Sequence, residues 1–317
     1  MSLIVHDDSP PVESVQARTV DTPKPHSALV DMVELIERGR KLYTTGIQPG
    51  SSIGFPTIDP YYTVAPGQWT VVTGIPGSGK SEFLDMALVN LAERDDQWEF
   101  GLYSPENYPQ ELHLIKLIEK RVRKPFSPGP SPRMTVAEYN EAAIWVAEHF
   151  FWIDPALKTP DQLIETGLGY RQRGKKFGIV LDPWNTLDHS RGGMNETDYV
   201  SLVLTDVTRM TRSAMCHVWL VVHPTKLQRE RDGKRPVPTP YDISGSAHWF
   251  NKADNIICVH RPDKGELTQD VLVLIQKIRH KNIGKVGEVT LLYDRVTGRY
   301  FEYPYPRIGN DLLREPL

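Results

Sequence analysis

Short apolar runs alternate with amphipathic segments along most of the chain. The runs are rich in β-branched and aromatic side chains, as buried strands are, and they lie at 69–73, 98–103, 150–153, 177–181, 217–222, 255–259 and 271–276. The amphipathic segments predict helices at 81–93, 109–121, 135–148, 160–173 and 197–214. Strands that alternate with helices in this way indicate βαβ units, so we predict a largely parallel central sheet covered by helices.

The last part of this region has a different pattern. Residues 271–303 show no helical period and predict antiparallel strands at 271–277, 287–293 and 299–303, with a turn at 294–298. The predicted fold is therefore an α/β core with a central, mostly parallel sheet and antiparallel C-terminal strands. We assign this core to residues 51–306 and a short tail to 307–317.

The segment before the core divides into a polar part and an amphipathic part. Residues 1–27 are rich in Pro, Ser, Thr and acidic groups without periodicity, and such a segment cannot bury enough apolar surface to offset the entropy of ordering. We therefore expect a disordered tail there. Residues 28–50 form a linker, in which apolar side chains at 29, 32, 33 and 36 share one face of a helix predicted over 28–38. This helix packs either on its own domain or on a neighbouring subunit, and both remain open.

Composition limits the class of protein. Hydrophobic residues make up 39% and charged residues 24%, as in ordinary globular proteins. The net charge of −3 argues against a generally basic surface, so any contact with nucleic acid must come from a local basic patch. Cys216 and Cys258 are too few for a disulfide framework, and no apolar run approaches the ~18 residues of a membrane span. We expect a soluble, cytoplasmic protein without a membrane partner.

One short stretch carries the strongest chemical signal. The sequence GIPGSGKS follows an apolar run and precedes a helical segment, which is the context that a phosphate-binding loop requires. The glycines let backbone N–H groups converge on a phosphate, to which the helix presents its positive end. Lys80 would bridge the β- and γ-phosphates, and Ser81 would hold Mg²⁺. The predicted ligands are ATP, or another nucleoside triphosphate, and Mg²⁺, bound by Gly74, Ile75, Pro76, Gly77, Ser78, Gly79, Lys80 and Ser81.

Hydrolysis needs further side chains at the same edge of the sheet, where the carboxyl ends of parallel strands meet. Asp182 ends a buried-strand pattern and suits the metal side of the site, acting through water. Pro183 rather than an acid follows it, so Glu106, after another strand, is the candidate that polarises the attacking water. His223, after a third strand, could report the loss of the γ-phosphate by hydrogen bonding. The plain alternatives are that Glu106 only begins a helix and that His223 is structural.

These landmarks together resemble a RecA-type core and, more closely, the hexameric replicative DNA helicases of the DnaB and Twinkle type. The resemblance covers about residues 28–303 and rests on ordered segments: GFPTID at 54–59, the phosphate loop, SPE at 104–106, LD at 181–182, HPTK at 223–226, DISGSAHWFNKADN at 242–255 and KIRHKN at 277–282.

The resemblance implies a ring whose ATP sites lie between subunits, with Glu106 as the catalytic carboxylate and His223 as the sensor of the γ-phosphate. Arg279 would be the arginine finger that enters the neighbour's site, with Lys277 beside it. Such a finger stabilises the charge that develops on the transferring phosphoryl group.

The chain departs from the family before its core. The family's fused primase or N-terminal collar has no counterpart in the tail and helix of residues 1–50. We therefore expect either a fragment of a longer primase–helicase or a compact helicase of the plasmid or phage kind.

The segment that follows His223 is the candidate DNA-binding loop. Residues 226–235 carry five basic and two acidic side chains between Pro- and Gly-containing stretches. By the resemblance this loop lines the ring channel, where cations follow the phosphate backbone without reading bases; a solvated run of charges is the plain alternative. A second loop, 186–195 with Arg191, could face the same channel. The predicted DNA-binding residues are Lys226, Arg229, Arg231, Lys234, Arg235, Ser244, Gly245, Ser246 and Lys252.

The function predicted from the sequence is that of an ATP-dependent replicative DNA helicase, which moves on single-stranded DNA as a homohexameric ring and unwinds duplex. A primase or a loader is a further candidate partner, and the replication fork or nucleoid the expected place of action. Two alternatives stay open: a RecA/RadA-like recombinase or KaiC-like regulatory ATPase, and a DNA-binding or assembly subunit with a nearly silent site. The predicted catalytic residues are Glu106, Lys80, Asp182, His223, Arg279 and Lys277.

Overall fold

The computed structural model describes residues 30–154, 156–157, 159–172, 174–187, 193–225, 227, 236–244, 246–262 and 269–304. The chain divides into two units after Gln48. Within the first unit, helix α1 (Met32–Thr45) begins at Asp31, whose carboxylate accepts the N–H of Val33 at 2.8 Å. The prediction of a helix over 28–38 was wrong in its bounds, because this cap sets a later start and the helix continues to Thr45.

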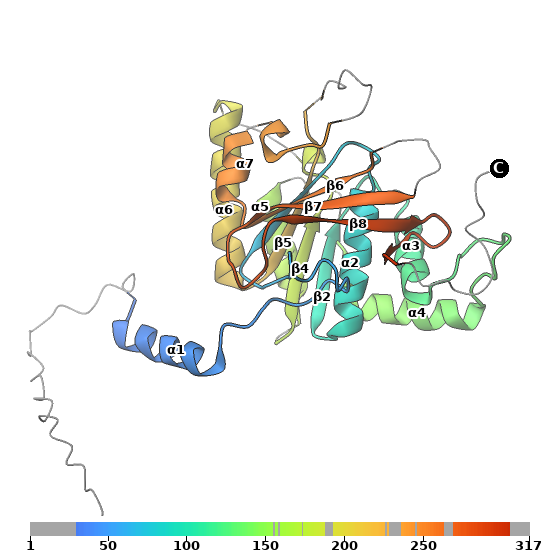
Figure 1. Ribbon diagram of the computed structural model, residues 1–317, viewed down its shortest axis with the longest axis horizontal. Helices are drawn as coiled ribbons and strands as arrows, with labels where there is room; N and C mark the ends of the chain where they lie inside the picture. Colours follow the sequence, from blue (N-terminus) through green and yellow to red (C-terminus); the bar gives the residue numbers. More distant parts are fainter. Residues whose placement is uncertain are drawn as a thin grey trace, which may run out of the picture. The chain divides into compact units, whose positions relative to one another are not determined.

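The second unit contains a nine-stranded sheet in the part of the chain that the structure describes, in the order β3-β2-β4-β5-β1-β6-β7-β8-β9. The first six strands pair in parallel and the last three antiparallel, which confirms the predicted fold class (Figure 1). Their bounds are β1 (Trp69–Thr73), β2 (Trp98–Tyr103), β3 (Phe150–Trp152), β4 (Lys176–Leu181), β5 (His217–Val222), β6 (Asn255–His260), β7 (Asp270–Ile278), β8 (Gly287–Asp294) and β9 (Arg299–Glu302).

Helices cover both faces of this sheet. Their bounds are α2 (Lys80–Arg94), α3 (Gln110–Val122), α4 (Val136–His149), α5 (Pro160–Tyr170), α6 (Glu196–Ala214) and α7 (Ser246–Lys252), with 3₁₀ turns η1 (Trp184–Thr186) and η2 (Pro240–Asp242). Helices α2, α3 and α4 share one apolar core with one face of the sheet, while α5, α6 and α7 share a second core with the other face (Figure 1). Helix α7 was not predicted, since its seven residues are too few to show a period.

Alternation along the strands assigns side chains to the two cores. Val71 lies in the core of α5–α7, whereas the next residue, Val72, lies in the core of α2–α4. On β5, Trp219 and Val221 belong to the α2–α4 core and Val218 to the other. Strands buried on both faces need continuous apolar runs, which is why the central strands stand out in the sequence.

The register of the parallel strands brings several loops to one edge of the sheet. Thr73 pairs with Val222, so the segments that begin at Gly74 and His223 leave the sheet side by side. Tyr103 pairs with Leu181 in the same way. The residues that follow β1, β2, β4 and β5 therefore lie together at this carboxyl edge of the sheet.

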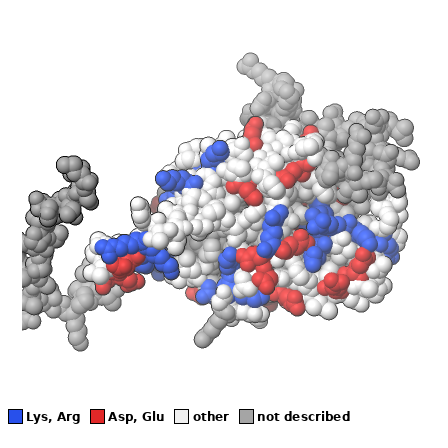
Figure 2. All heavy atoms as spheres, turned by 60° about the horizontal axis from the view of Figure 1, so that its bottom comes forward, with Lys and Arg blue, Asp and Glu red and all other residues white. Residues whose placement is uncertain are grey.

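Basic and acidic side chains are interspersed on the face of the molecule drawn in Figure 2, rather than gathered by sign. Ion pairs also join neighbouring elements: Arg121 of α3 pairs with Glu93 of α2 at 3.2 Å, and Lys124, which follows α3, pairs with Glu138 of α4 at 2.5 Å. Among the described residues, no helix is long and apolar enough to cross a membrane.

Candidate functional site

The glycine turn between β1 and α2 adopts a conformation that favours glycine at several of its positions. Gly77 and Gly79 have φ angles of 72° and 96°, in the left-handed region that favours glycine. At Gly74 a Cβ atom would lie 2.2 Å from the carbonyl oxygen of Val259 on β6. Among the described residues, no side chain caps the start of α2 at Gly79. The first N–H groups of α2 therefore face the turn, as in sites that bind anions.

Lys80 places a positive charge inside this turn. Its side chain is buried, and its ammonium donates to the carbonyl oxygens of Gly74 at 2.9 Å and Ile75 at 3.3 Å. A buried ammonium next to convergent backbone N–H groups favours a phosphate over any neutral ligand, because charge-assisted hydrogen bonds to phosphate are the strongest that such donors make.

Asp182 meets Ser81 at the carboxyl edge. Burial raises the pKa of the Asp182 carboxyl to about 6; a hydrogen bond with Ser81 and the charge of Lys80 oppose this rise, and the charges of Asp85 and Glu106 add to it. A nearby cation would therefore stabilise the ionised form of Asp182, which lies close to other acidic groups.

A hydroxyl and one carboxylate fit the demands of Mg²⁺. This ion is held by one or two protein oxygens and completes its octahedral shell with water and phosphate oxygens. Ser81 and Asp182 are thus suited to Mg²⁺ that arrives with a nucleotide.

Glu106 and His223 face each other at the same edge, with 3.9 Å between the Glu106 Oε1 and His223 Nε2 atoms. Burial and the charge of Lys80 lower the pKa of His223, although Glu106 opposes this effect. The imidazole is therefore neutral at pH 7 and can both donate and accept hydrogen bonds. Its backbone N–H donates to Asn185 Oδ1 at 3.0 Å, which ties the end of β5 to η1.

A set of contacts from α3 supports the Glu106 turn, and sequence reasoning missed it. Lys116 donates to Asn107 Oδ1 at 3.0 Å and pairs with Glu82 of α2 at 3.0 Å. Asn107 in turn donates to Ser104 Oγ at 2.8 Å. The turn is thereby held to both α2 and α3. No local motif signals this, because Lys116 looks like any other basic residue of an amphipathic helix.

Lys277 and Arg279 do not reach the phosphate loop of their own chain. Ile278 pairs with Asn255, and Asn255 pairs with Thr70, so β7 ends at the amino edge of β1. Gly74 lies four residues further along, or about 13 Å at ~3.3 Å per residue. The structure therefore separates Arg279 from the five residues that it brings together: Lys80, Ser81, Glu106, Asp182 and His223.

Both cations instead contact the C-terminal end of α7. Arg279 donates to the carbonyl oxygens of Asn251, Lys252 and Ala253 at 2.9, 3.0 and 3.1 Å, and its Nε atom pairs with Asp254 at 2.9 Å. Lys277 donates to the carbonyl oxygen of Phe250. Burial and the charge of Arg279 lower the pKa of Lys277 to about 8, while Asp254 opposes this shift. Positive groups at this end of a helix satisfy its last carbonyls and complement its dipole.

Most of the predicted DNA-binding residues lie outside the described residues: Lys226, Arg229, Arg231, Lys234, Arg235 and Gly245, together with Arg191 of the second loop. Ser246 begins α7, and its side chain is likewise outside the description. Ser244 donates to the carboxylate of Glu196. Lys252 donates to Ser201 Oγ at 2.8 Å and to Thr205 Oγ1 at 2.5 Å, so its ammonium is directed at α6.

The two ends of the segment that follows His223 are joined by hydrogen bonds. The N–H and hydroxyl of Thr225 both donate to the carbonyl oxygen of Asp242 at 2.7 Å. Asp242 in turn accepts from the N–H and hydroxyl of Thr239 at 2.7 and 2.8 Å. The segment between Thr225 and Asp242 therefore starts two residues after His223 and ends in η2.

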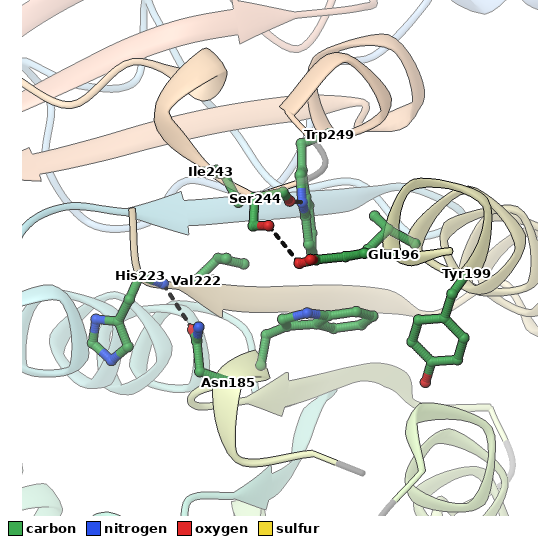
Figure 3. Close-up of a pocket in the computed structure, with 10 residues that line it drawn as sticks. Asn185, Glu196, Tyr199, Val222, His223, Ile243, Ser244 and Trp249 are labelled. Carbon is green, nitrogen blue, oxygen red and sulfur yellow. Dashed lines mark hydrogen bonds between the residues drawn. The ribbon is translucent and has the colours of Figure 1, made fainter. Parts of the chain in front are cut away.

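A cavity of about 110 Å³ lies beside His223 rather than in the phosphate loop. Figure 3 shows Glu196 and Ser244 turned toward each other across it, with Asn185 next to His223. It is lined by Trp184, Asn185, Glu196, Tyr199, Val200, Val222, His223, Ile243, Ser244 and Trp249. The cavity is thus bordered by His223 at the end of β5 and by Trp249 of α7.

Known proteins share both the sequence and the fold. No family model matches the chain. Over 271 residues it is 42% identical to the Twinkle homolog protein, chloroplastic/mitochondrial, of Arabidopsis thaliana. The chain is homologous to part of that protein. The shared stretch covers 82% of this chain and 38% of that protein, so this chain spans well under half the length of its relative.

Solved structures with the fold of this chain include a DnaB-like replicative helicase described with its interactions with primase. Its TM-score is 0.69 at 19% identity, covering 86% of this chain and 68% of that one. Another solved ATPase domain has a TM-score of 0.71 at 18% identity, covering 86% and 98% of the two chains. The RadB recombinase is less similar, with a TM-score of 0.53 at 12% identity over 80% and 99%. These likenesses confirm the RecA-like fold.

The raised pKa of Asp182 predicts a specific effect of pH on stability. The folded protein binds a proton at this carboxyl up to about pH 6, whereas the unfolded chain releases it near 3.8. Below pH 3.8 the carboxyl is neutral in both states and does not lower the free energy of unfolding. As pH rises from 3.8 through 6, the unfolded chain loses its proton more readily and the free energy of unfolding falls. We expect Asp182→Asn to stabilise the nucleotide-free protein by up to ~3 kcal/mol at pH 7.5 and by almost nothing at pH 4, since one pKa unit is worth about 1.4 kcal/mol.

Urea unfolding at these two pH values measures the difference. The exposed Asp96 provides the matched control, because Asp96→Asn removes a carboxylate of the same chain without relieving burial. An Asp182→Asn gain of equal size at both pH values would contradict the assignment.

Proposed function

We propose that the protein is an ATP-dependent replicative DNA helicase, which moves along single-stranded DNA as a ring and unwinds duplex. The observation that carries this proposal is the carboxyl edge of the sheet, where Lys80, Asp182 and the Glu106–His223 pair meet in a chain homologous to Twinkle. Without the homology the same edge would support nucleotide hydrolysis alone, because the RecA-like fold serves several kinds of ATPase.

Each residue of this edge has a part in the proposed hydrolysis of ATP. The N–H groups of the loop and the ammonium of Lys80 bind the β- and γ-phosphates and balance their charge. Mg²⁺, held by Ser81 and by Asp182 through water, would supply Lewis-acid stabilisation of the phosphate oxygens. Glu106 accepts a hydrogen bond from the attacking water and orients it in line with the γ-phosphate. The neutral His223 donates a hydrogen bond to the γ-phosphate.

The position of Arg279 supports a site shared between two copies of the chain. Its guanidinium is at the amino edge, so the phosphate loop of its own chain is out of its reach. In the proposed ring, Arg279 balances the charge on the phosphoryl group that is transferred in the adjacent subunit, and Lys277 lies beside it. Exposed apolar side chains of α1, including Val33 and Ile36, offer each copy a further surface for a neighbour. Six subunits are the number that we propose.

Coupling to DNA is proposed to run through the segment that starts at Thr225. His223 is two residues before Thr225, whose bonds to Asp242 join both ends of this segment. A shift of His223 on loss of the γ-phosphate would therefore move both ends together. The basic residues at 226–235 remain predicted DNA contacts. A primase is a candidate partner, as one solved neighbour is a helicase described with its primase interactions.

The place of action is part of the proposal. The name of the Arabidopsis relative puts that protein in chloroplasts or mitochondria. The cytoplasmic location expected from the sequence stays a prediction for this chain, and the replication fork is the place that its proposed activity requires.

Glu106→Gln tests the proposed chemistry. The amide cannot accept the water proton as the carboxylate does, so we expect ATP turnover and strand displacement on a forked duplex to fall by at least about a hundredfold, with ATP still bound. Glu111→Gln, an exposed acid five residues away, is the control and should keep both activities. If the wild type hydrolyses ATP yet separates no duplex under any loading condition, the helicase assignment is wrong.

Mixing two inactive variants tests the shared site. Arg279→Ala and Lys80→Ala should each lose at least about a hundredfold in turnover, since a finger arginine is worth ~10³ or more. Mixed rings contain interfaces in which an intact Lys80 meets an intact Arg279, so turnover should partly return. Arg212, which also pairs with Asp254 at 3.7 Å, supplies the control, because Arg212→Ala should remain active alone. Absence of rescue at every mixing ratio would argue for a site within one chain.

A further inference from the structure

The antiparallel hairpin of β8 and β9 contacts the last residue before α2 in the phosphate loop. Tyr300 on β9 donates its hydroxyl to the carbonyl oxygen of Gly79 at 3.1 Å, across 221 positions of sequence. Tyr300 is 2% exposed, and burial raises its pKa well above the usual range, so the hydroxyl keeps its proton and remains a donor. No phosphate-loop motif includes this residue.

The bond acts on the peptide unit that joins Gly79 to Lys80. The Gly79 carbonyl oxygen also accepts the N–H of Phe83 at 2.8 Å, the first helical bond of α2. Two donors therefore occupy both lone pairs of this oxygen. Because a trans peptide unit is planar and its C=O and N–H point in opposite directions, fixing the carbonyl also fixes the Lys80 N–H, which is turned toward the inside of the loop.

Contacts away from the loop hold Tyr300 in place. Its ring meets that of Phe83 edge to face, with centroids 5.9 Å apart, and lies 5.1 Å from the ring of Tyr293 on β8. The adjacent Arg299 donates to the carbonyl oxygen of Lys120 on α3, and Lys120 pairs with Glu82 of α2 at 2.5 Å. The ring of Tyr300 and the neighbouring Arg299 are therefore held by contacts with α2, α3 and β8.

Tyr300 and Gly79 also fit each other sterically. A Cβ atom at position 79 would lie 2.5 Å from the Tyr300 hydroxyl oxygen. The residue at 79 must therefore be glycine for two reasons, its φ of 96° and the space that the tyrosine occupies.

We propose that Tyr300 is a positioning residue of the nucleotide site, which presets the Lys80 N–H and the last turn of the phosphate loop for the β-phosphate. This inference rests on the proposed function, because it assumes that the loop binds a nucleoside triphosphate. It adds a residue from the C-terminal hairpin to a site whose predicted members all lie at the carboxyl edge or at the end of β7.

Tyr300→Phe removes the hydroxyl and keeps the ring. We expect the dissociation constants of ATP and ADP, measured by calorimetric titration, to rise about three- to tenfold, the usual worth of one buried hydrogen bond. The KM for ATP should rise with them, while kcat should change by less than about twofold because Glu106 and Asp182 are untouched. If Tyr300 had only a structural role, the substitution would lower the melting temperature without raising the dissociation constants and KM at nearly constant kcat.

Tyr62→Phe is the matched control. Tyr62 is also buried, and its hydroxyl contacts Thr70 at 2.9 Å and accepts from Trp219 at 3.2 Å, at the amino end of β1. It should lose stability while keeping nucleotide affinity. Unchanged affinity in Tyr300→Phe overturns the role of Tyr300 but leaves the nucleotide site intact. A wild type that binds neither ATP nor ADP overturns the proposed function and this inference with it.

A double-mutant cycle tests the same contact without nucleotide. Gly79→Ala should lower the melting temperature less in the Tyr300→Phe background than in the wild type, since the clash with the hydroxyl is then absent and only the strain of the positive φ remains. Equal losses in the two backgrounds would show that the hydroxyl does not lie against position 79 and would overturn the proposal.

Discussion

The pairing of β1 with β5 and of β2 with β4 is the constraint on which the candidate site depends. Thr73 lies opposite Val222, and Tyr103 opposite Leu181, so the chain leaves the sheet at adjacent points. A slip of one residue would exchange the faces of Val71 and Val72 and put each in the wrong core. The same apolar contacts that stabilise the fold therefore also bring Lys80, Asp182 and His223 together.

The sequence predicts the fold well where burial is two-sided. The central strands are continuous apolar runs, so their places and the parallel class of the sheet were correct. Boundaries set by single hydrogen bonds were not, as at α1, where the Asp31 cap decides the start. The short α7 has no measurable period, so the sequence does not predict it. Its contacts with Lys277 and Arg279 depend on the pairing of β6 with β7, which brings together residues far apart in the sequence; Arg279 and Asn251, for example, are 28 positions apart.

For the site, sequence reasoning finds the residues that stand directly after strands or within a known loop. Glu106, Asp182 and His223 do lie at one edge, and their roles remain predictions. It cannot find Lys116 or Tyr300, because each reaches the site from another element by a tertiary contact. Lys252 shows the opposite case. Its charge suggested DNA, yet its ammonium is bonded to Ser201 and Thr205 of α6, and only the packing of α7 on α6 could reveal this.

The bonds between Arg279 and the end of α7 have a consequence for how this region tolerates change. Three consecutive carbonyl oxygens and the carboxylate of Asp254 hold the guanidinium, so the arginine has little freedom of its own. The position of the guanidinium therefore depends on the residue at which α7 ends. Lengthening or shortening that helix by one residue would rotate the terminal carbonyls by roughly 100° and carry the guanidinium with them. Insertions and deletions should therefore be rarer in this seven-residue helix than its small size and surface position suggest.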